Sequence, residues 1–374
     1  MGGPHAAQPS LESRSRGAVF AMVRLCVATV VLVTTTSWPM TSLAPAVQIP
    51  NLAGKILTVT GPVDPWEIGP TIMHEHILIA RTTRVVEGAL PPSVLALCRE
   101  PISLRNLSAV RQYTASPNRD CLYNFYDLTD VNDAVAEVSE FKRWGGNTIV
   151  EVSNLGLGRD PDGLARVAGA AGLNIVMGAG WYQKGYHPPD MDMRTVEDLT
   201  DVIIRDITVG ADRTPIRSGI IGEVGVNGNP LTPNEIKSIR ASARASRATG
   251  AALSFHNGGH RGEKLAVLDA VEAEGVSPTR VIFGHSKSLL RDELLMMRLL
   301  ERGAYLQFDT LGYDEVIVRS RLGALDDRAV AQSIVKLIKR GFGDRILLSQ
   351  DVCTKLQLKK YGCLLYTSPS PRDS

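Results

Sequence analysis

Residues 69–79, with the sequence GPTIMHEHILI, place two histidines, His74 and His76, inside a short apolar run. Side chains alternate between the two faces of an extended strand, so these two imidazoles point to the same side. Burying two imidazoles side by side is unfavourable unless something binds them, and a divalent cation is the expected partner. The motif is short, and by itself it fits two ordinary hydrogen-bonded histidines equally well. The rest of the chain decides between these interpretations.

Four further apolar runs later in the chain each stop at a residue type that binds metals. Each run has the length of a strand buried on both faces, as in a parallel sheet. The first three stops are about thirty residues apart, the size of one strand–helix unit, and another apolar run, 304–308, precedes the last stop. Metal-binding residues at the carboxyl ends of successive parallel strands are typical of a (β/α)8 barrel active site. The runs 218–222, 251–255, 280–284 and 345–350 stop at Glu223, His256, His285 and Asp351.

The chain is therefore expected to fold as a (β/α)8 TIM barrel over residues 47–362. Residues 80–125, after the first strand, are expected to form a long, irregular insertion. Its Cys98 and Cys121 are the only plausible disulfide pair of the mature domain. Further strands are predicted at 147–152 and 174–180, and helices at 130–143, 195–210, 234–249 and 262–275.

Residues 1–46 are expected to be a separate leader. Three arginines precede the apolar run 25–33, which is too short to span a membrane. Ala44-Pro45-Ala46 then has the small-residue pattern of signal-peptide cleavage. With a genuine signal the protein would be secreted or periplasmic, with no membrane span in its mature form, and without one it would be cytoplasmic. The alternatives are a spurious upstream extension and a membrane anchor.

The other end of the chain is unusual. Residues 363–374, CLLYTSPSPRDS, have neither a helical period nor the pattern of a barrel strand. A barrel needs a helix after its eighth strand to cover the first and last strands. We therefore expect this tail to be non-native and the last strand–helix unit to be truncated. A native disordered tail is the alternative.

Composition agrees with one large enzyme domain and argues against nucleic-acid binding. With 374 residues, 44% of them hydrophobic, the chain can bury a full barrel core. The formal charge is only +2, and residues 1–46 hold three arginines and one glutamate, so the remaining domain is close to neutral. Such a surface offers no basic footprint for nucleic acid. A small-molecule substrate is the expected partner, and whether the protein is a homodimer is left open.

The motifs resemble, in order and in spacing, those of the phosphotriesterase-related family, the parathion hydrolase-like members of the amidohydrolase superfamily. The resemblance covers about residues 55–362. It is carried by TVTGPV at 58–63, GPTIMHEH at 69–76, GIIGEVG at 219–225, FGH at 283–285, ILLSQD at 346–351 and TKLQLKKYG at 354–362.

This resemblance implies a centre with two divalent metal ions, usually zinc. The bridge in the best-known phosphotriesterases is a carbamylated lysine, and here Glu223 takes its position, as in other related members. That difference argues against efficient organophosphate hydrolysis, although two carboxylate oxygens can still bridge two cations. The ligands would be His74, His76 and Asp351 for one ion and His256 and His285 for the other, with Glu223 between them.

The expected activity is hydrolysis of a carboxyl ester, lactone or N-acyl amide by a metal-bridged hydroxide. Asp351 is the candidate that carries the proton to the leaving group. Tyr182, Tyr186 and His187, in the loop after the third strand, are candidates for substrate contact, with simple loop packing as the alternative. Asp309 and Lys287 are weaker candidates. Phosphotriester hydrolysis and a non-catalytic metal-binding barrel are the alternative functions.

Overall fold

The computed structural model describes residues 51–81, 91–113, 122, 125–257, 262–312 and 326–363. The chain divides into two compact units, Met1–Ala46 and Val47–Ser374. The first unit, with the expected leader, lies outside the described residues, as do all but the first residue of the expected tail. The leader and the foreign origin of the tail therefore stay predictions. Among the described residues, no helix has the length and apolar character needed to cross a membrane.

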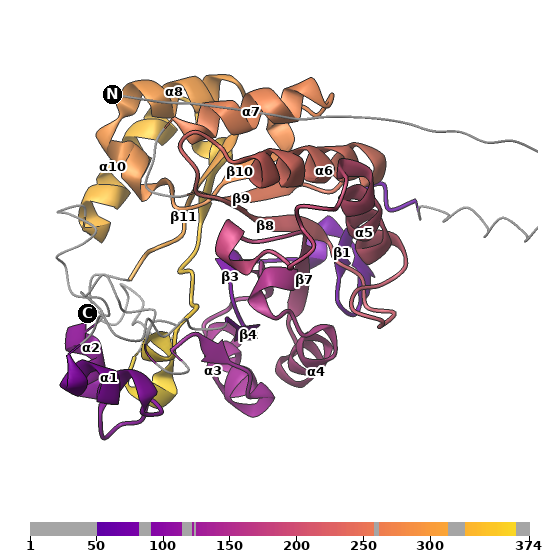
Figure 1. The fold of residues 1–374 in the computed structure, drawn as a ribbon. Helices are drawn as coiled ribbons and strands as arrows, with labels where there is room; N and C mark the ends of the chain where they lie inside the picture. Colours follow the sequence, from indigo (N-terminus) through magenta and orange to yellow (C-terminus); the bar gives the residue numbers. More distant parts are fainter. Residues whose placement is uncertain are drawn as a thin grey trace, which may run out of the picture. The chain divides into compact units, whose positions relative to one another are not determined.

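Eight parallel strands form a single sheet that closes into a nearly complete barrel (Figure 1). Their spatial order follows the sequence, and each strand pairs in parallel with the next. This confirms the predicted barrel. The strands are β3 (Thr71–Glu75), β6 (Thr148–Glu151), β7 (Asn174–Ala179), β8 (Ile220–Val226), β9 (Leu253–Asn257), β10 (Val281–Phe283), β11 (Tyr305–Phe308) and β12 (Ile346–Leu348).

Backbone hydrogen bonds join the first strand to the chain just after the last one. The N–H of His76 donates to the carbonyl oxygen of Val352, and the N–H of Asp351 donates to the carbonyl oxygen of His74, each at 3.1 Å. These bonds lie at the carboxyl ends of β3 and β12. The barrel is therefore closed at the end where the predicted ligands lie.

The helices surround the strands, as Figure 1 shows. Capping side chains set several of their starts: Asp130 accepts hydrogen bonds from the first turn of α3, and Thr195 and Thr232 do the same for α5 and α6. The four helices predicted from the sequence are present as α3, α5, α6 and α7. The helices are α3 (Val131–Arg143), α4 (Pro161–Ala171), α5 (Val196–Thr208), α6 (Pro233–Thr249), α7 (Glu263–Ala273), α8 (Glu293–Glu301) and α10 (Asp327–Lys339).

The segment expected to be an irregular insertion contains two short helices, so that expectation was wrong in part. These are α1 (Pro92–Arg99) and α2 (Leu107–Tyr113). Each has at most eight residues, and a helix that short is held by packing rather than by its own sequence. Both pack beside the final turns of the chain, η8 (Lys355–Gln357) and η9 (Lys359–Tyr361).

Other short elements flank this insertion. The strands β4 (Ile79–Ala80) and β5 (Asp127–Leu128) pair antiparallel on its two sides. Cys98 is disulfide-bonded, whereas its expected partner Cys121 lies outside the described residues. The insertion is therefore tied to the barrel mouth at its beginning and at its end.

A hairpin of β1 (Ile56–Thr58) and β2 (Gly61–Val63) lies at the opposite end of the barrel. The N–H of Val59 donates to the carbonyl oxygen of Ile175, near the start of β7, at 2.8 Å. Ile56 packs against the buried apolar side chains of the barrel interior, among them Val150 and Ile282. The interior is therefore filled from this end, and open space for a ligand remains at the carboxyl ends of the strands.

Candidate metal centre

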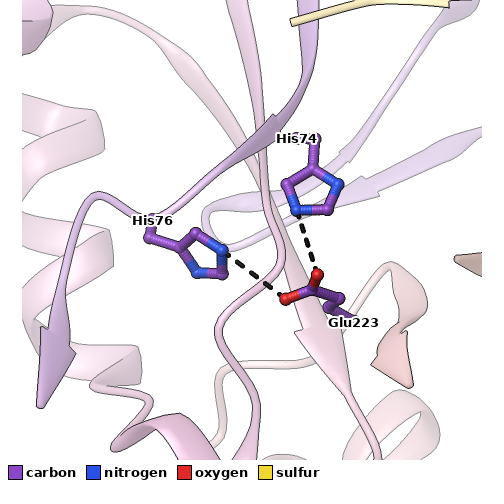
Figure 2. Close-up of side chains that lie close together, drawn as sticks. All are labelled: His74, His76 and Glu223. Atoms are coloured by element: carbon purple, nitrogen blue, oxygen red, sulfur yellow. Dashed lines mark ion pairs between the residues drawn. The ribbon is translucent and has the colours of Figure 1, made fainter. Parts of the chain in front are cut away.

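Four histidines and two carboxylates converge at the carboxyl ends of the barrel strands. His74 and His76 come from β3 and the residue after it, and both imidazoles point at the Glu223 carboxylate (Figure 2). His74 Nε2 lies 3.4 Å from one oxygen of Glu223, and His76 Nε2 lies 3.6 Å from the other. The two oxygens of one buried carboxylate therefore face different histidines.

Two more histidines contact the oxygen of Glu223 that also faces His74. Nδ1 of His256 lies 2.5 Å and Nε2 of His285 lies 3.2 Å from Oε1 of Glu223. These two ring nitrogens are only 2.8 Å apart. Glu223 thus belongs to two groups that could each hold a metal ion, one with His74 and His76 and one with His256 and His285.

Asp351 completes the set of predicted ligands. Its Oδ1 lies 3.3 Å from Nε2 of His76 and 3.7 Å from Nε2 of His74. The structure therefore brings all six predicted residues together, from strands as far apart in sequence as β3 and β12. One detail differs from the sequence pattern, because Glu223 and His256 lie within β8 and β9 rather than after their ends.

The donor set fits a metal ion. Nε2 of His74 is fully buried and makes no hydrogen bond. Buried polar atoms without a partner are uncommon in folded proteins and call for an explanation. Histidine nitrogens and carboxylate oxygens are the donors that zinc accepts, and an ion in reach of this nitrogen would satisfy it.

The backbone is irregular next to several of the residues that converge at this site. The pairing of β3 with β6 shifts register between Ile72 and Glu75, and the pairing of β8 with β9 shifts between Ile221 and Val224. Register shifts of this kind redirect side chains and are common beside active sites. His285 and Asp351 have positive φ angles, 54° and 49°, a conformation that is strained for residues other than glycine. The local geometry is therefore adapted to the site rather than to regular sheet structure.

A second layer of buried residues orients the histidines. Nδ1 of His76 contacts the Ser153 hydroxyl at 2.9 Å, and Nδ1 of His74 contacts Oε1 of Gln307 at 3.1 Å. Since Nδ1 is engaged in both rings, Nε2 is left for an ion. Ser153 and Gln307 could not be identified from the sequence, because a serine or glutamine beside a strand carries no distinctive signal.

Asp309, a weaker candidate for substrate contact in the sequence, contacts histidines of the cluster instead. It is fully buried, and its carboxylate accepts from the N–H of His285 at 2.8 Å and lies 3.0 Å from Nδ1 of the same residue. It also lies 3.3 Å from Nδ1 of His74. Asp309 thus holds two histidines in place and does not contact the open pocket. Lys287 also stays away from that pocket, with Nζ 3.4 Å from Asp327.

Charge within the cluster is balanced between histidines and carboxylates. Burial alone would lower the pKa of His74, but the charges of Glu223 and Asp309 outweigh burial and raise it to about 10. Burial would raise the pKa of Glu223, but the neighbouring charges of His256 and His74 hold it well below its usual value. The neighbouring carboxylates thus favour the protonated form of His74. Metal binding would displace that proton, as is general for such sites.

A pocket opens directly onto this cluster. Glu223, His256, His285 and Asp351 line it, together with the aromatic ring of Tyr182. The Tyr182 hydroxyl lies 3.2 Å from Nδ1 of His256. Burial, followed by the charge of Glu223, raises the pKa of Tyr182 well above its ordinary value, so the phenol keeps its proton.

Tyr186 and His187, the other two residues predicted to contact substrate, do not line this pocket. Tyr186 does not line the pocket, but its hydroxyl accepts a hydrogen bond from Nε of Arg81, which does. His187 does not line the pocket either, and its electrostatic neighbours include Glu235 and Asp192. Of the three predicted residues, only Tyr182 therefore faces the open space.

Glu75, between the two histidines of β3, ties that strand to the segment that carries Asp351. Its buried carboxylate accepts hydrogen bonds from the Ser349 hydroxyl at 2.6 Å and from the N–H groups of Gln350 and Val352 at 2.9 and 2.8 Å. Its role was not apparent from the sequence. Its position indicates that it holds the first and last strands together at the site.

We expect Glu75→Gln to destabilise the protein by about 2 kcal/mol or more, because an amide NH2 would face backbone donors and leave buried groups unpaired. Urea unfolding of the metal-free protein measures this loss. Glu301→Gln, at an exposed position at the end of α8, is the matched control and should leave the unfolding midpoint unchanged. Equal midpoints for the two variants would contradict the role assigned to Glu75.

Comparisons with known proteins agree with the fold. The model of the phosphotriesterase family matches residues 54–368. An N-acetyltaurine hydrolase from Dictyostelium discoideum is 35% identical over 330 residues, which cover 83% of this chain and 88% of that protein. An N-acetyltaurine hydrolase from Rattus norvegicus is 32% identical over 314 residues, with the same coverage of each chain.

A solved structure is also similar to this chain. The resiniferatoxin-binding protein from Rhodobacter sphaeroides superimposes with a TM-score of 0.75 and is 35% identical, covering 83% of this chain and 85% of that chain. The family model spans nearly the whole described barrel, including every strand that carries a predicted ligand. From the fold, the cluster and these matches together, the chain belongs to the phosphotriesterase family.

Proposed function

We propose that this protein is a binuclear metal-dependent hydrolase that cleaves N-acyl amides. The family and the names of the relatives support hydrolysis as the class of reaction, and the substrate in those names, N-acetyltaurine, is an N-acyl amide. The observation that carries the proposal is the position of Glu223, which two groups of histidines share. A carboxylate in that position would be a ligand common to both ions.

The residues present fit two divalent ions, and zinc is the expected metal for histidine and carboxylate donors. Such ions supply an activated water near neutral pH and polarise the oxygen of the acyl group. The expected ligands are His74, His76 and Asp351 for one ion and His256 and His285 for the other, with Glu223 between them.

Asp351 is the candidate that transfers a proton from water to the leaving group. Its carboxylate lines the pocket. Burial would raise the pKa of Asp351, but the hydrogen bond to His76 and the charge of His74 lower it, so the carboxylate is ionised at neutral pH. During hydrolysis, water adds to the acyl carbon and the carbon–nitrogen bond breaks. Asp351 would pass the proton from that water to the leaving nitrogen, giving a carboxylic acid and an amine.

Tyr182 is the candidate that binds the substrate beside this group. Its neutral hydroxyl lies in the pocket and next to His256, so it can donate a hydrogen bond to a substrate oxygen. Esters and lactones have the same acyl oxygen and remain possible substrates of this geometry. Glu223 in place of a lysine bridge argues against phosphotriesters as the preferred substrates.

A second candidate function is ligand binding without turnover. It is favoured by the similarity to the resiniferatoxin-binding protein, which is 35% identical. Against it stands the complete set of six converging metal-type residues around an open pocket. A binding role alone requires no such open centre.

Protein loaded with zinc is expected to retain about two equivalents of metal and to hydrolyse N-acyl amides, because Glu223 can hold two ions a short distance apart. Metal content is measured by elemental analysis of the folded, desalted protein. Turnover is measured with N-acyl amino acids, lactones and phosphotriesters in parallel. We expect the N-acyl amides to be the best substrates and chelation to remove their hydrolysis.

Metal content tests the binuclear centre, and turnover tests the substrate class. One equivalent of metal or none in a folded, zinc-supplemented sample would rule out the binuclear centre. Two equivalents with no turnover of any substrate would favour ligand binding. Faster turnover of phosphotriesters than of N-acyl amides would move the substrate to the phosphoester class.

A further inference from the structure

Arg81 lies at the mouth of the pocket that opens onto the metal centre. It directly follows β4, and its side chain lines the same pocket as Glu223, His256 and Asp351. Among the described residues that line this pocket, Arg81 is the only lysine or arginine. Its position was not apparent from the sequence, because an arginine after a short strand has no distinctive pattern.

Two tyrosines fix the plane of the Arg81 guanidinium. Its central carbon lies 4.2 Å from the centre of the Tyr126 ring and 4.8 Å from the centre of the Tyr186 ring. Its Nε also donates a hydrogen bond to the Tyr186 hydroxyl. Cation–π contacts of this kind hold an arginine in one orientation while leaving it charged. The arginine is therefore preorganised before any ligand arrives.

The surroundings of Arg81 strengthen its effect on a ligand. Ile79, Phe125 and Leu157 line the same pocket, and a ligand packed against their apolar side chains would displace water from it. A charge acts more strongly on a ligand where water is excluded. The pocket therefore combines a reaction centre with one oriented cation held in aromatic and aliphatic walls.

We propose that Arg81 recognises an anionic group, a sulfonate or a carboxylate, on the amine portion of the substrate. The planar guanidinium matches the paired oxygens of either group. This inference rests on the proposed N-acyl amide hydrolysis and names the chemical class of its substrate. The acyl group would lie at the metal centre beside Asp351, and the anionic end would lie toward Arg81. Arg81 is thus a specificity-determining residue that takes no part in the bond cleavage.

The test compares substrates that differ in one charge. N-acetyl-β-alanine carries a carboxylate, its carboxamide is the neutral match, and N-acetyl-2-aminoethanesulfonate carries a sulfonate. We expect the parent protein to prefer both anions over the carboxamide. Arg81→Met keeps an unbranched side chain and removes its charge. It should raise KM for the anions about 10- to 100-fold, the range for loss of a charged hydrogen bond, with little effect on the neutral amide.

Two further variants make the result specific. Arg81→Lys keeps the charge but loses the planar fork, and we expect it to recover part of the preference. Arg345→Met is the matched control, because Arg345 also lies over a tyrosine ring, 4.9 Å from the centre of Tyr305, but does not line the pocket. It should leave the preference for anions unchanged. If Arg81→Met weakens anionic and neutral substrates equally, Arg81 has a structural role and the proposal is wrong.

A direct measurement of binding tests the role of Arg81 without relying on the proposed hydrolysis. Calorimetric titration of the zinc-loaded parent and Arg81→Met proteins with the sulfonate and with the carboxamide requires no turnover. Tighter binding of the sulfonate by the parent, lost in Arg81→Met, supports the proposal even if neither compound is hydrolysed, in which case only the proposed reaction fails. Equal affinity of the parent and the variant for the sulfonate would overturn the role of Arg81.

Discussion

Replacing Glu223 with alanine is expected to remove most of the bound metal and, with it, the hydrolytic activity. One oxygen of Glu223 faces His74, His256 and His285, and the other faces His76. The substitution therefore removes the group common to both candidate ion positions. Loss of an outer partner of a metal ligand already costs about 10- to 100-fold in metal affinity or activity, and loss of the bridge should cost more. Metal content after desalting, together with turnover, measures the effect.

Glu235→Ala is a suitable control for this experiment. Glu235 is also a buried glutamate, 1% exposed, but it accepts hydrogen bonds from the backbone of Asn227 and Thr232 at the start of α6. Its loss should lower stability without lowering the metal content. Two equivalents of metal in folded Glu223→Ala protein would remove Glu223 from the bridging position.

Asp351→Asn is expected to keep much of the metal but to lose hydrolysis by about 10²-fold or more, the typical contribution of a general acid or base. The amide oxygen of asparagine can still contact an ion. It cannot accept the proton that the reaction releases, whereas the ionised carboxylate of Asp351 can. The measurement is the turnover number per bound metal at saturating substrate.

A contrast with Asp309→Asn sharpens this result. Asp309 contacts His285 and His74 and lies outside the pocket, so its variant should weaken metal binding more than turnover per bound metal. An Asp351→Asn protein that hydrolyses its best substrate at the parental rate would leave Asp351 as a ligand only.

Local sequence patterns were sufficient to predict the barrel and to identify the candidate ligands that the structure brings together. Apolar runs of strand length, each followed by a helical segment, specify alternating strands and helices, and such units close into a parallel barrel. Because active sites in this fold lie at the carboxyl ends of the strands, the residues at those ends could be identified from the chain alone. His285 and Asp351 illustrate this, since each directly follows an apolar run in the sequence.

The helices of the insertion could not be predicted in the same way. α1 and α2 are too short to be stable by propensity, and they form where they can pack against the turns η8 and η9. Those turns come more than two hundred residues later in the chain, so no local pattern connects the two segments.

The sequence by itself determined which residue types stand at the strand ends, because that depends on periodicities of a few residues. Only the tertiary structure decided how they are used. It placed Glu223 between two histidine groups, turned Asp309 into a support for His285, and set Arg81 beside the same pocket. These relations depend on strand closure and on register shifts within β3 and β8, which bring together residues such as His74 and Ser349, 275 positions apart. Contacts over that separation follow from the closed barrel and not from any local property of the chain.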